Sequence, residues 1–303
     1  DWAPKADNML FVGNGRQAIG ASLAALASPG ERFGVEAFSY PFIKSMAARL
    51  GVGLVPIALD DRGMCPDAIA QAHREHGIKG IYVQSALHNP LGLTMDADRR
   101  RSIARLLIEL DLTAIEDGVY SFLADEPPLA SIAPSHVVMV DSLSKRISPG
   151  ANLGVATGPD RLVDRLAQSV RQGGWTASGL SVAAAVQWMS DGSADRIQAA
   201  KREDAAARQA IASETLAGLS IRRDPRSYHL WLDLPEPWRA NMFCAAAARL
   251  GIAVAPARVF ATQPGHAPPA IRVALSTPRH DTLRTALSAL ARLARSDPDH
   301  MVE

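Results

Sequence analysis

The chain has 303 residues, of which 48% are apolar and 21% are charged, a composition typical of a globular protein with a large core. Its formal net charge of +1 excludes the strong basic field by which some proteins bind nucleic acid or membranes. No apolar run approaches membrane-spanning length, no signal peptide is visible, and Cys65 and Cys244 lack partners at metal-ligand spacing. We therefore expect a cytoplasmic protein with reduced thiols, two lobes and no metal.

The first element expected is a strand at Met9–Val12, which ends at the turn Gly13-Asn14-Gly15 and precedes an alanine-rich helix. Such a turn leaves backbone N–H groups at a helix N-terminus, where a phosphate binds well, but an ordinary tight turn has the same pattern. Further strands are expected at 33–36, 52–59, 80–84, 112–115 and 137–140, with helices between most of them. This alternation predicts an α/β fold with a doubly wound, mostly parallel sheet.

Turn-rich or polar segments follow the last three of these strands. They are Asn89-Pro90-Leu91-Gly92, Asp117-Gly118-Val119-Tyr120 and Ser142-Leu143-Ser144-Lys145. Ligands bind in crevices outside the carboxyl ends of parallel strands. A lysine partly removed from water there can lose its proton and attack a carbonyl to form a Schiff base, although a surface lysine after a strand would look the same.

The chain also contains long helical segments. One helix begins at Asp96, and the arginines at positions 99, 100, 101 and 105 are expected on its solvent side. A long charged helix at 194–218 is predicted to link two lobes, and alternating strands with two helices follow it. We place the boundary near Asp191, which gives a large domain at residues 1–190 and a smaller α+β domain at residues 191–303.

The three motifs, in this order and spacing, resemble those of fold-type-I pyridoxal-phosphate enzymes, the aspartate aminotransferase superfamily, over residues 9 to 295. The resemblance implies that Lys145 binds the aldehyde of pyridoxal 5'-phosphate covalently and moves protons as a general base. It implies that the carboxylate of Asp117 keeps the pyridine nitrogen of the cofactor protonated. The expected catalytic residues are Lys145, Asp117 and Tyr120.

The same resemblance assigns the remaining contacts to the cofactor and substrate. Asn89 and Tyr120 match the partners of the phenolate oxygen, and Tyr40 matches the stacking residue, although it could be an ordinary loop aromatic. Arg272 matches the arginine that binds the substrate carboxylate, although a surface position on an alternating strand is possible. The expected phosphate ligands are Gly15, Arg16, Gln17, Ser142 and Ser144. His88 and His229 are expected to be packing residues.

The chain departs from the family pattern in two respects. Asn152 occupies the position of a phosphate-binding arginine, a charge that Arg16 or Arg146 would have to replace. The N-terminal arm that precedes the first phosphate-binding turn in this superfamily is missing from the large domain at 1–190. From the first departure we expect reduced affinity for the phosphate, and from the second we expect incomplete catalytic competence.

Within the superfamily, the segments 228–235 and 251–256 and the tripeptide Gly173-Gly174-Trp175 are most similar to the aminotransferase-like domain of MocR-type transcription regulators of the GntR family. The resemblance implies a homodimer, with the loop from Gly173 to Thr176 facing the neighbour, and DNA binding only through a domain outside this chain. Three functions are considered: an effector-sensing domain that binds an amino acid or amine, a stand-alone class I/II aminotransferase acting on an amino acid, and a plain nucleotide-binding protein. The last leaves Lys145 unexplained and lacks the usual glycine spacing.

Overall fold

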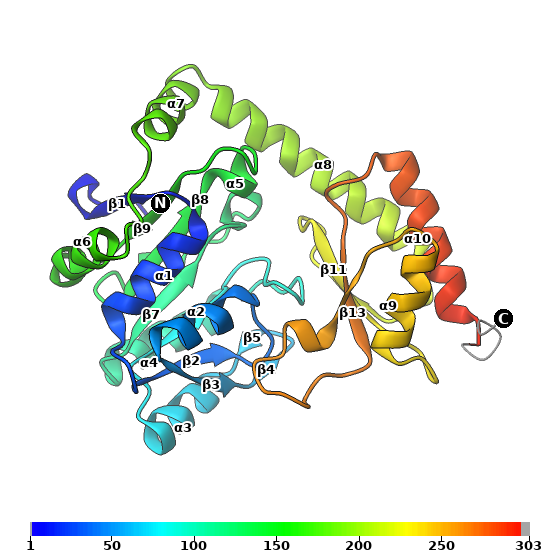
Figure 1. Ribbon diagram of the computed structural model, residues 1–303, viewed down its shortest axis with the longest axis horizontal. Helices are drawn as coiled ribbons and strands as arrows, with labels where there is room; N and C mark the ends of the chain where they lie inside the picture. Colours follow the sequence, from blue (N-terminus) through cyan, green and yellow to red (C-terminus); the bar gives the residue numbers. More distant parts are fainter. Residues whose placement is uncertain (1, 298–303) are drawn as a thin grey trace. The chain divides into compact units, whose positions relative to one another are not determined.

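The computed structural model describes residues 2–297, and the chain divides into two compact units (Figure 1). The second unit contains Phe38–Pro41, Leu87–Leu93 and the described chain from Arg202 onward, and the first unit contains the rest. The division at Lys201 and Arg202 falls inside one continuous helix, α8 (Ser193–Thr215). It therefore lies further along the chain than the boundary expected near Asp191.

The first unit is built on a seven-stranded sheet with the order β1-β9-β8-β7-β6-β2-β3. Its strands are β1 (Met9–Val12), β2 (Arg32–Glu36), β3 (Gly53–Ile57), β6 (Gly80–Val83), β7 (Thr113–Asp117), β8 (Val137–Ser142) and β9 (Gly154–Thr157). β9 runs antiparallel to both of its neighbours, and the other strand pairs are parallel. This confirms the α/β class with a mostly parallel sheet.

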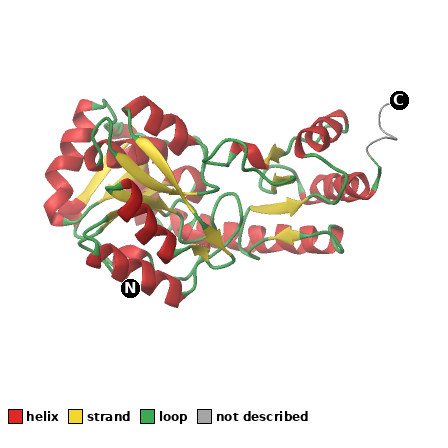
Figure 2. Ribbon diagram, turned by 90° about the horizontal axis from the view of Figure 1, so that it is seen from below, coloured by secondary structure: helices red, strands yellow, loops and turns green. Residues whose placement is uncertain are grey.

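Helices cover both faces of this sheet, whose strands are yellow in Figure 2. The helices of the first unit are α1 (Gly15–Leu26), α2 (Phe42–Leu50), α3 (Pro66–His76), α4 (Ala97–Glu109), α5 (Leu143–Arg146), α6 (Val163–Gln172), α7 (Gly179–Ser190) and the start of α8. α1 packs on β7, β8 and β9, and α6 packs on α1. On the other face, α3 and α4 bury Ile69, Ile103 and Leu107 against Val83 and Ala114. None of the helices among residues 2–297 is both long and apolar enough to cross a membrane.

The second unit contains a four-stranded antiparallel sheet with the order β10-β11-β13-β12. Its elements are β10 (Ile221–Arg222), β11 (His229–Asp233), β12 (Ala255–Pro256), β13 (Ala270–Ala274), α9 (Ala240–Arg249) and α10 (His280–Arg295). Leu230 and Ile271 from the sheet pack with Phe243 of α9 and Leu287 of α10 in one core. The sheet and its two helices agree with the smaller α+β lobe expected from the sequence, but β11 is buried at every residue from His229 to Leu232, so it does not alternate between buried and exposed positions as expected.

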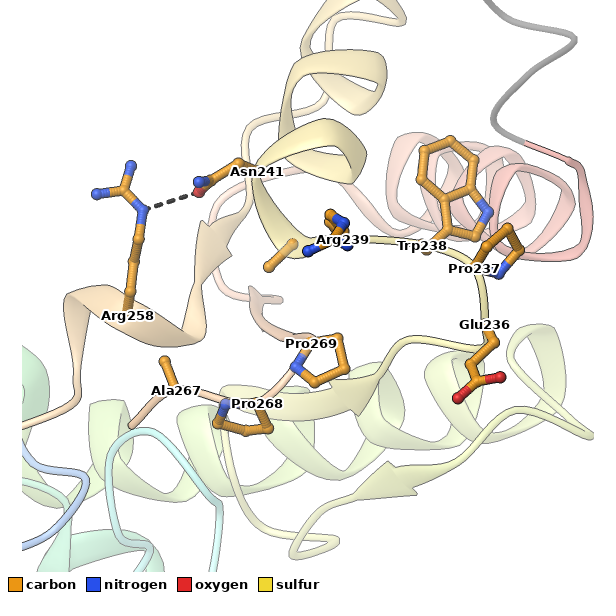
Figure 3. A pocket seen from close by; sticks show the side chains of 10 residues that line it. Glu236, Pro237, Trp238, Arg239, Asn241, Arg258, Ala267, Pro268 and Pro269 are labelled. Atoms are coloured by element: carbon orange, nitrogen blue, oxygen red, sulfur yellow. Dashed lines mark hydrogen bonds between the residues drawn. The ribbon is translucent and has the colours of Figure 1, made fainter. Parts of the chain in front are cut away.

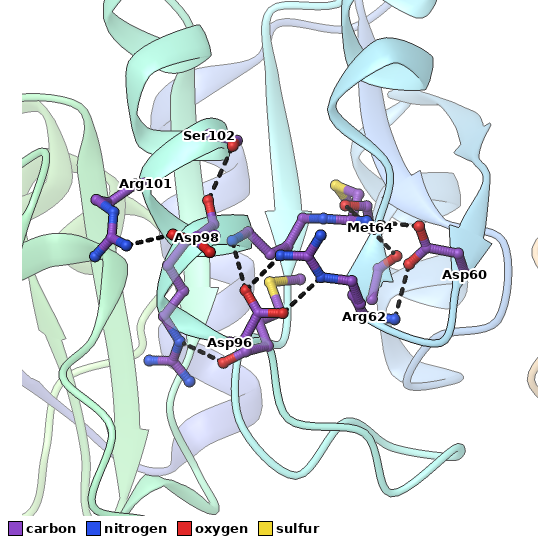
Figure 4. A network of polar contacts seen from close by, with 11 residues as sticks. Asp60, Arg62, Met64, Asp96, Asp98, Arg101 and Ser102 are labelled. Carbon is purple, nitrogen blue, oxygen red and sulfur yellow. Dashed lines mark hydrogen bonds and ion pairs between the residues drawn. The ribbon is translucent and has the colours of Figure 1, made fainter.

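A polar network connects the N-terminus of α4 to the hairpin β4 (Leu59–Asp60) and β5 (Gly63–Met64) (Figure 4). Asp96 caps α4 by accepting a hydrogen bond from the backbone N–H of Arg99 at 2.8 Å, and it also pairs with Arg62 at 2.5 Å. The Arg99 guanidinium is buried and donates to the carbonyls of Gly63 and Met64 at 3.1 and 2.7 Å, and to Asp60 at 2.5 Å.

The expectation that all four arginines of α4 face solvent is wrong for Arg99 and Arg100. Arg100 is also buried, and it donates to the carbonyls of Met95 and Ser85 at 3.0 and 2.9 Å. Backbone carbonyls from loops thus satisfy guanidinium donors inside the protein, which a helical charge pattern does not reveal. Arg101 and Arg105 are exposed, as expected.

Replacement of Arg99 by alanine is expected to lower the free energy of unfolding by about 3–5 kcal/mol, because it leaves two buried carbonyls without their donor and removes the ion-pair partner of Asp60. The matched control is Arg101→Ala at a nearby position of the same helix, which removes an exposed ion pair with Asp98 and is expected to cost at most about 1 kcal/mol. Urea denaturation of the two variants measures the difference. Equal denaturation midpoints would contradict the assignment of Arg99 as a structural clamp.

Candidate active site

Strand register brings several predicted site residues to one edge of the large sheet. Val12, Gly154 and Ser142 are neighbours across β1, β9 and β8, and Asp117 is paired with Val140 on β7 and β8. Side chains two residues apart on a strand point to the same face, so Asp117 and Ser142 lie on the same face at adjacent strand ends. The turn after β1 is held at this edge as well.

That turn forms a tight cradle at the N-terminus of α1. A Cβ atom on Gly154 would lie 2.4 Å from the backbone of Asn14, and one on Gly15 would lie 3.0 Å from Cβ of Ser142. Asn14 caps α1 by accepting from the backbone N–H of Gln17 at 3.1 Å. The side-chain oxygen of Gln17 is buried without a hydrogen-bond partner among the described residues. This oxygen only accepts hydrogen bonds, so an anionic ligand here would be bound by the backbone N–H groups at the N-terminus of α1.

Two hydroxyl groups stand beside this cradle. Ser142 Oγ caps α5 by accepting from the backbone N–H of Ser144 at 3.1 Å, and the two hydroxyl oxygens are 3.0 Å apart. Close packing of Gly15 against Ser142 therefore places both the helix N-terminus and these hydroxyls at one position. Together they provide the kind of donors that a phosphate accepts.

The cations that could complete this site differ in their surroundings. Arg16 is exposed, with its guanidinium 5.6 Å from the ring centre of Phe42. Arg146 is bound to Asp141 and to Gln198, each at 2.5 Å. Asn152 is exposed. Arg146 already neutralises a carboxylate, which leaves Arg16 as the better of the two expected substitutes for the family arginine.

Asp117 is a buried carboxyl group with two donors. Tyr82 donates its phenolic O–H to Oδ2 at 2.5 Å, and the backbone N–H of Val119 donates to Oδ1 at 3.1 Å. Burial raises the pKa of Asp117 to about 6; these two hydrogen bonds act in the opposite direction, whereas the charges of Asp141 and Glu36 raise the pKa further. A carboxylate in such surroundings is suited to bind a cationic partner.

Glu116, the preceding residue, points to the opposite face of the sheet and has a structural role. Its carboxyl accepts from the backbone N–H groups of Leu129 and Ala130 at 2.9 and 3.1 Å, and from the hydroxyl of Ser85. Burial raises its pKa as well. Adjacent residues on a strand point to opposite faces of the sheet. Glu116 therefore binds loop backbone on one face, and Asp117 lies on the face that carries the cradle.

Lys145 lies in the short helix α5, directly after the strand end that carries Ser142. Lys145 is exposed, whereas the sequence led us to expect a lysine partly removed from water. Its backbone carbonyl accepts from Nζ of Lys201 at 2.7 Å. Tyr120 is half-buried in the turn that follows β7.

The other predicted residues belong to the second unit. Arg272 on β13 donates to the side-chain oxygen of Asn89 at 3.0 Å, and its guanidinium lies 5.2 Å from the ring centre of Phe260. Tyr40 is half-buried, and the segment that carries it is anchored by a hydrogen bond of 3.0 Å from the backbone N–H of Ser39 to the carbonyl of Phe260. Tyr40 and Asn89, which the sequence predicts to contact the cofactor, therefore belong to the second unit.

His229 helps to hold the Asn89 segment in place. Its Nε2 lies 3.0 Å from the carbonyl of His88, and its Nδ1 lies 3.1 Å from the hydroxyl of Ser227. Burial lowers the pKa of His229 to about 4, so the ring is neutral at neutral pH, with its proton on Nε2 facing the carbonyl. This is the arrangement of a packing residue rather than an acid or base.

A pocket of about 580 Å³ opens at the N-terminus of α9 in the second unit (Figure 3). Arg258 crosses to Asn241, where its Nε donates at 2.8 Å, and Trp238 and Arg239 also line the pocket. None of the predicted site residues is among its lining residues. The pocket is thus separate from the chemistry described above.

The family model of aminotransferase class I and II matches residues 3–290. The chain belongs to this family. Enzymes of this fold type use pyridoxal 5'-phosphate, in agreement with the resemblance seen in the motifs. The match includes residues of both units.

Several curated relatives are named as transcription regulators. The chain is 31% identical over 290 residues to "Uncharacterized HTH-type transcriptional regulator YdeF" of Bacillus subtilis, with 95% of this chain and 63% of that protein covered. It is 30% identical over 270 residues to "Uncharacterized HTH-type transcriptional regulator YdcR" of Escherichia coli, with coverage of 84% and 57%. The chain thus spans less than two thirds of each relative.

Solved structures share the fold. An archaeal alanine:glyoxylate aminotransferase superposes with a TM-score of 0.88 at 21% identity, covering 96% of this chain and 76% of that chain. LysN, the α-aminoadipate aminotransferase of Thermus thermophilus, superposes with a TM-score of 0.86 at 18% identity, covering 98% and 79%. That structure contains N-(5'-phosphopyridoxyl)-L-leucine. These likenesses confirm the fold-type-I architecture.

Asp117→Asn is expected to stabilise the cofactor-free protein at high pH but not at low pH. Below about pH 4 the carboxyl is protonated in both the folded and the unfolded chain, so its burial adds no pH-dependent penalty. As the pH rises from about 4 to 6, the carboxyl ionises in the unfolded chain but stays protonated in the folded chain, which lowers the stability of the wild type by up to about 3 kcal/mol. Above pH 6 the carboxyl is ionised in both states and the penalty stays constant. Urea denaturation at pH 4.5, 6 and 8 measures the gap, which is the difference in the free energy of unfolding between wild type and variant.

The control is Asp61→Asn, which removes an exposed charge of the same kind. It is expected to change the free energy of unfolding by at most about 0.5 kcal/mol. A gap for Asp117→Asn that stays constant from pH 4.5 to pH 8 would show that the buried carboxyl carries no raised pKa.

Proposed function

We propose that this chain is the pyridoxal-phosphate-binding, effector-sensing domain of a MocR/GntR-type transcription regulator. The observation that carries the proposal is the pair of Asp117, a buried carboxyl, and the phosphate-type cradle at Gly15 and Ser142 on one face of the sheet. The regulator part is supported by the names of the relatives, YdeF and YdcR, which are longer than this chain. DNA would be bound by a domain outside these residues, and the protein would be cytoplasmic.

The residues of the first unit fit the cofactor. Asp117 would hold the protonated pyridine nitrogen, and the backbone at Gly15 with the hydroxyls of Ser142 and Ser144 would hold the phosphate. The close packing of Gly15 against Ser142 supports a phosphate site at this turn. Arg16 and Gln17 complete the proposed phosphate contacts. When bound, pyridoxal 5'-phosphate supplies an aldehyde that reacts with amines and a ring that withdraws electrons.

The protein's own groups then have separable tasks. Lys145 offers the amine that captures the aldehyde, and it moves a proton at the α-carbon of an amino ligand if catalysis occurs. Arg272 binds a carboxylate of the ligand by its fork of donors. Asn89, which accepts from Arg272, would share its amide with the phenolate oxygen, together with Tyr120, and Tyr40 would stack on the ring. The ligand is accordingly an amino acid or amine.

The alternative is a class I/II aminotransferase that acts on an amino acid. It uses the same residues, and the solved structures with this fold carry aminotransferase titles. The exposed Asn152 in place of a phosphate-binding arginine favours sensing, because a weakly held phosphate is poorly suited to repeated turnover. The two functions differ in whether a bound amino acid is converted.

We further propose that the chain works as a homodimer through α7. Leu180, Val186 and Met189 of this helix are 81%, 58% and 62% exposed, although the helix is almost entirely apolar. The preceding loop is fixed beside the cradle, because the backbone N–H of Gly13 donates to the carbonyl of Trp175 at 3.1 Å. A second copy of the chain is the proposed cover for this surface.

Lys145 is expected to be the attachment point of the cofactor. Addition of pyridoxal 5'-phosphate should produce visible absorbance, and borohydride reduction followed by peptide mapping should locate the label on Lys145. The variant Lys145→Ala should lose the absorbance, whereas Lys201→Met, at the neighbouring amine, should keep it. A label on Lys201 with Lys145 unmodified would refute the assignment.

Sensing and turnover are distinguished by adding single amino acids to the cofactor-loaded protein. A sensor is expected to change its absorbance spectrum upon binding while releasing less than one equivalent of keto acid, even with a keto-acid acceptor present. Arg272→Gln should weaken the response to amino acids far more than the response to amines without a carboxylate. Multiple turnovers of keto acid would support the aminotransferase instead.

The homodimer is tested by Leu180→Glu, which places a charge on the exposed face of α7. Sedimentation equilibrium is expected to show a dimer for the wild type and a shift toward monomer for the variant, with dimer affinity reduced at least tenfold. Ile108→Glu, at a 53% exposed apolar position of α4, is the control and should leave the dimer intact. A wild-type monomer at micromolar concentration would contradict the proposal.

A further inference from the structure

Tyr82 is a fully buried tyrosine that no sequence motif singled out. It lies on β6, and its register partner on β7 is Ile115, two residues before Asp117. Residues in register on neighbouring strands share a face, so the side chains of Tyr82 and Asp117 lie on the same side of the sheet. The phenolic oxygen reaches Oδ2 of Asp117 at 2.5 Å.

Two elements therefore fix the orientation of the Asp117 carboxyl. Tyr82 of β6 binds Oδ2, and the backbone N–H of Val119, in the turn after β7, binds Oδ1. With one donor on each oxygen, the carboxyl cannot rotate without breaking both bonds. A tyrosine that served only to fill the core could be replaced by phenylalanine there without consequence for this group.

Two neighbouring carboxylates act on Asp117. Asp141 on β8 and Glu36 on β2 both raise its pKa, in addition to the effect of burial. Arg146 pairs with Asp141 and so reduces the influence of that acid. The phenol of Tyr82 donates a hydrogen bond that stabilises ionised Asp117. This hydrogen bond lowers the pKa of Asp117 and so offsets part of the increase caused by burial.

We propose that Tyr82 is the positioning residue of this site: its hydroxyl orients the Asp117 carboxyl and stabilises its ionised form. The functional value of this contact rests on the proposed function, because a carboxylate that is protonated or rotated away binds a protonated ring nitrogen poorly. The contact itself can be tested on the cofactor-free protein, so the two ideas can fail separately.

The first experiment uses Tyr82→Phe in the presence and absence of Asp117→Asn. In the wild-type background and in the Tyr82→Phe background, urea denaturation of the cofactor-free proteins gives the free energy of unfolding with and without Asp117→Asn. The difference between these two free energies, the stability gap, is followed against pH. In the wild-type background the gap grows from about pH 4 and levels off near pH 6. In the Tyr82→Phe background it should level off about one pH unit higher, which moves the midpoint of the rise upward, because a hydrogen bond to a charged group is lost. Tyr228→Phe, which removes a phenol donor from Asp204 in the second unit, is the matched control and should leave the midpoint unchanged.

The second experiment titrates pyridoxal 5'-phosphate into wild type and Tyr82→Phe at pH 6 and pH 8. A one-unit rise in the pKa of Asp117 leaves roughly a tenth of the carboxyl ionised at pH 6, where the wild type has half. Affinity should therefore fall roughly fivefold at pH 6 and hardly at all at pH 8. Loosened packing alone would weaken binding equally at both values.

The outcomes separate cleanly. An unmoved midpoint in Tyr82→Phe, with circular dichroism unchanged, overturns the role of Tyr82, as does an equal loss of affinity at both pH values. A shifted midpoint in a protein that takes up no cofactor would uphold the contact between Tyr82 and Asp117 and refute the proposed function instead.

Discussion

The burial of one carboxyl group, Asp117, is the constraint around which the first unit is organised. Removing a carboxylate from water is costly, and the folded chain reduces this cost with one donor from a neighbouring strand and one from the following turn. These two donors need β6 and β7 in register and the chain turning at Val119. The position of the acid is therefore a consequence of the whole sheet rather than of the local motif.

The same register explains how distant segments meet. The antiparallel strand β9 lies between β1 and β8. A side chain at its first residue, Gly154, would clash with the backbone of Asn14 in the turn after β1. In the second unit, Arg272 and His229 hold the segment of Asn89 by its side chain and by its backbone. Each unit thus contains its own pre-formed group of polar residues, built from segments far apart in the sequence.

The sequence predicted the fold class and the strands that carry the motifs because buried parallel strands are nearly continuous apolar runs. It could not identify Tyr82, which looks like any aromatic in such a run until the register places it beside Asp117. The exposure of Lys145 and the burial of Arg99 were also missed. Both depend on neighbours from other elements, and a linear pattern contains no information on which carbonyls surround an arginine.

The central claim is that Asp117 binds the protonated ring nitrogen of the cofactor, and it is tested most directly by NMR with pyridoxal 5'-phosphate labelled with ¹⁵N in the ring. In the wild-type protein at pH 8 the account predicts the ¹⁵N chemical shift of a protonated pyridine. In Asp117→Asn it predicts the shift of the neutral ring, because the asparagine amide provides no negative charge to hold the proton. An unprotonated nitrogen in the wild type, or the same shift in both proteins, would contradict the account.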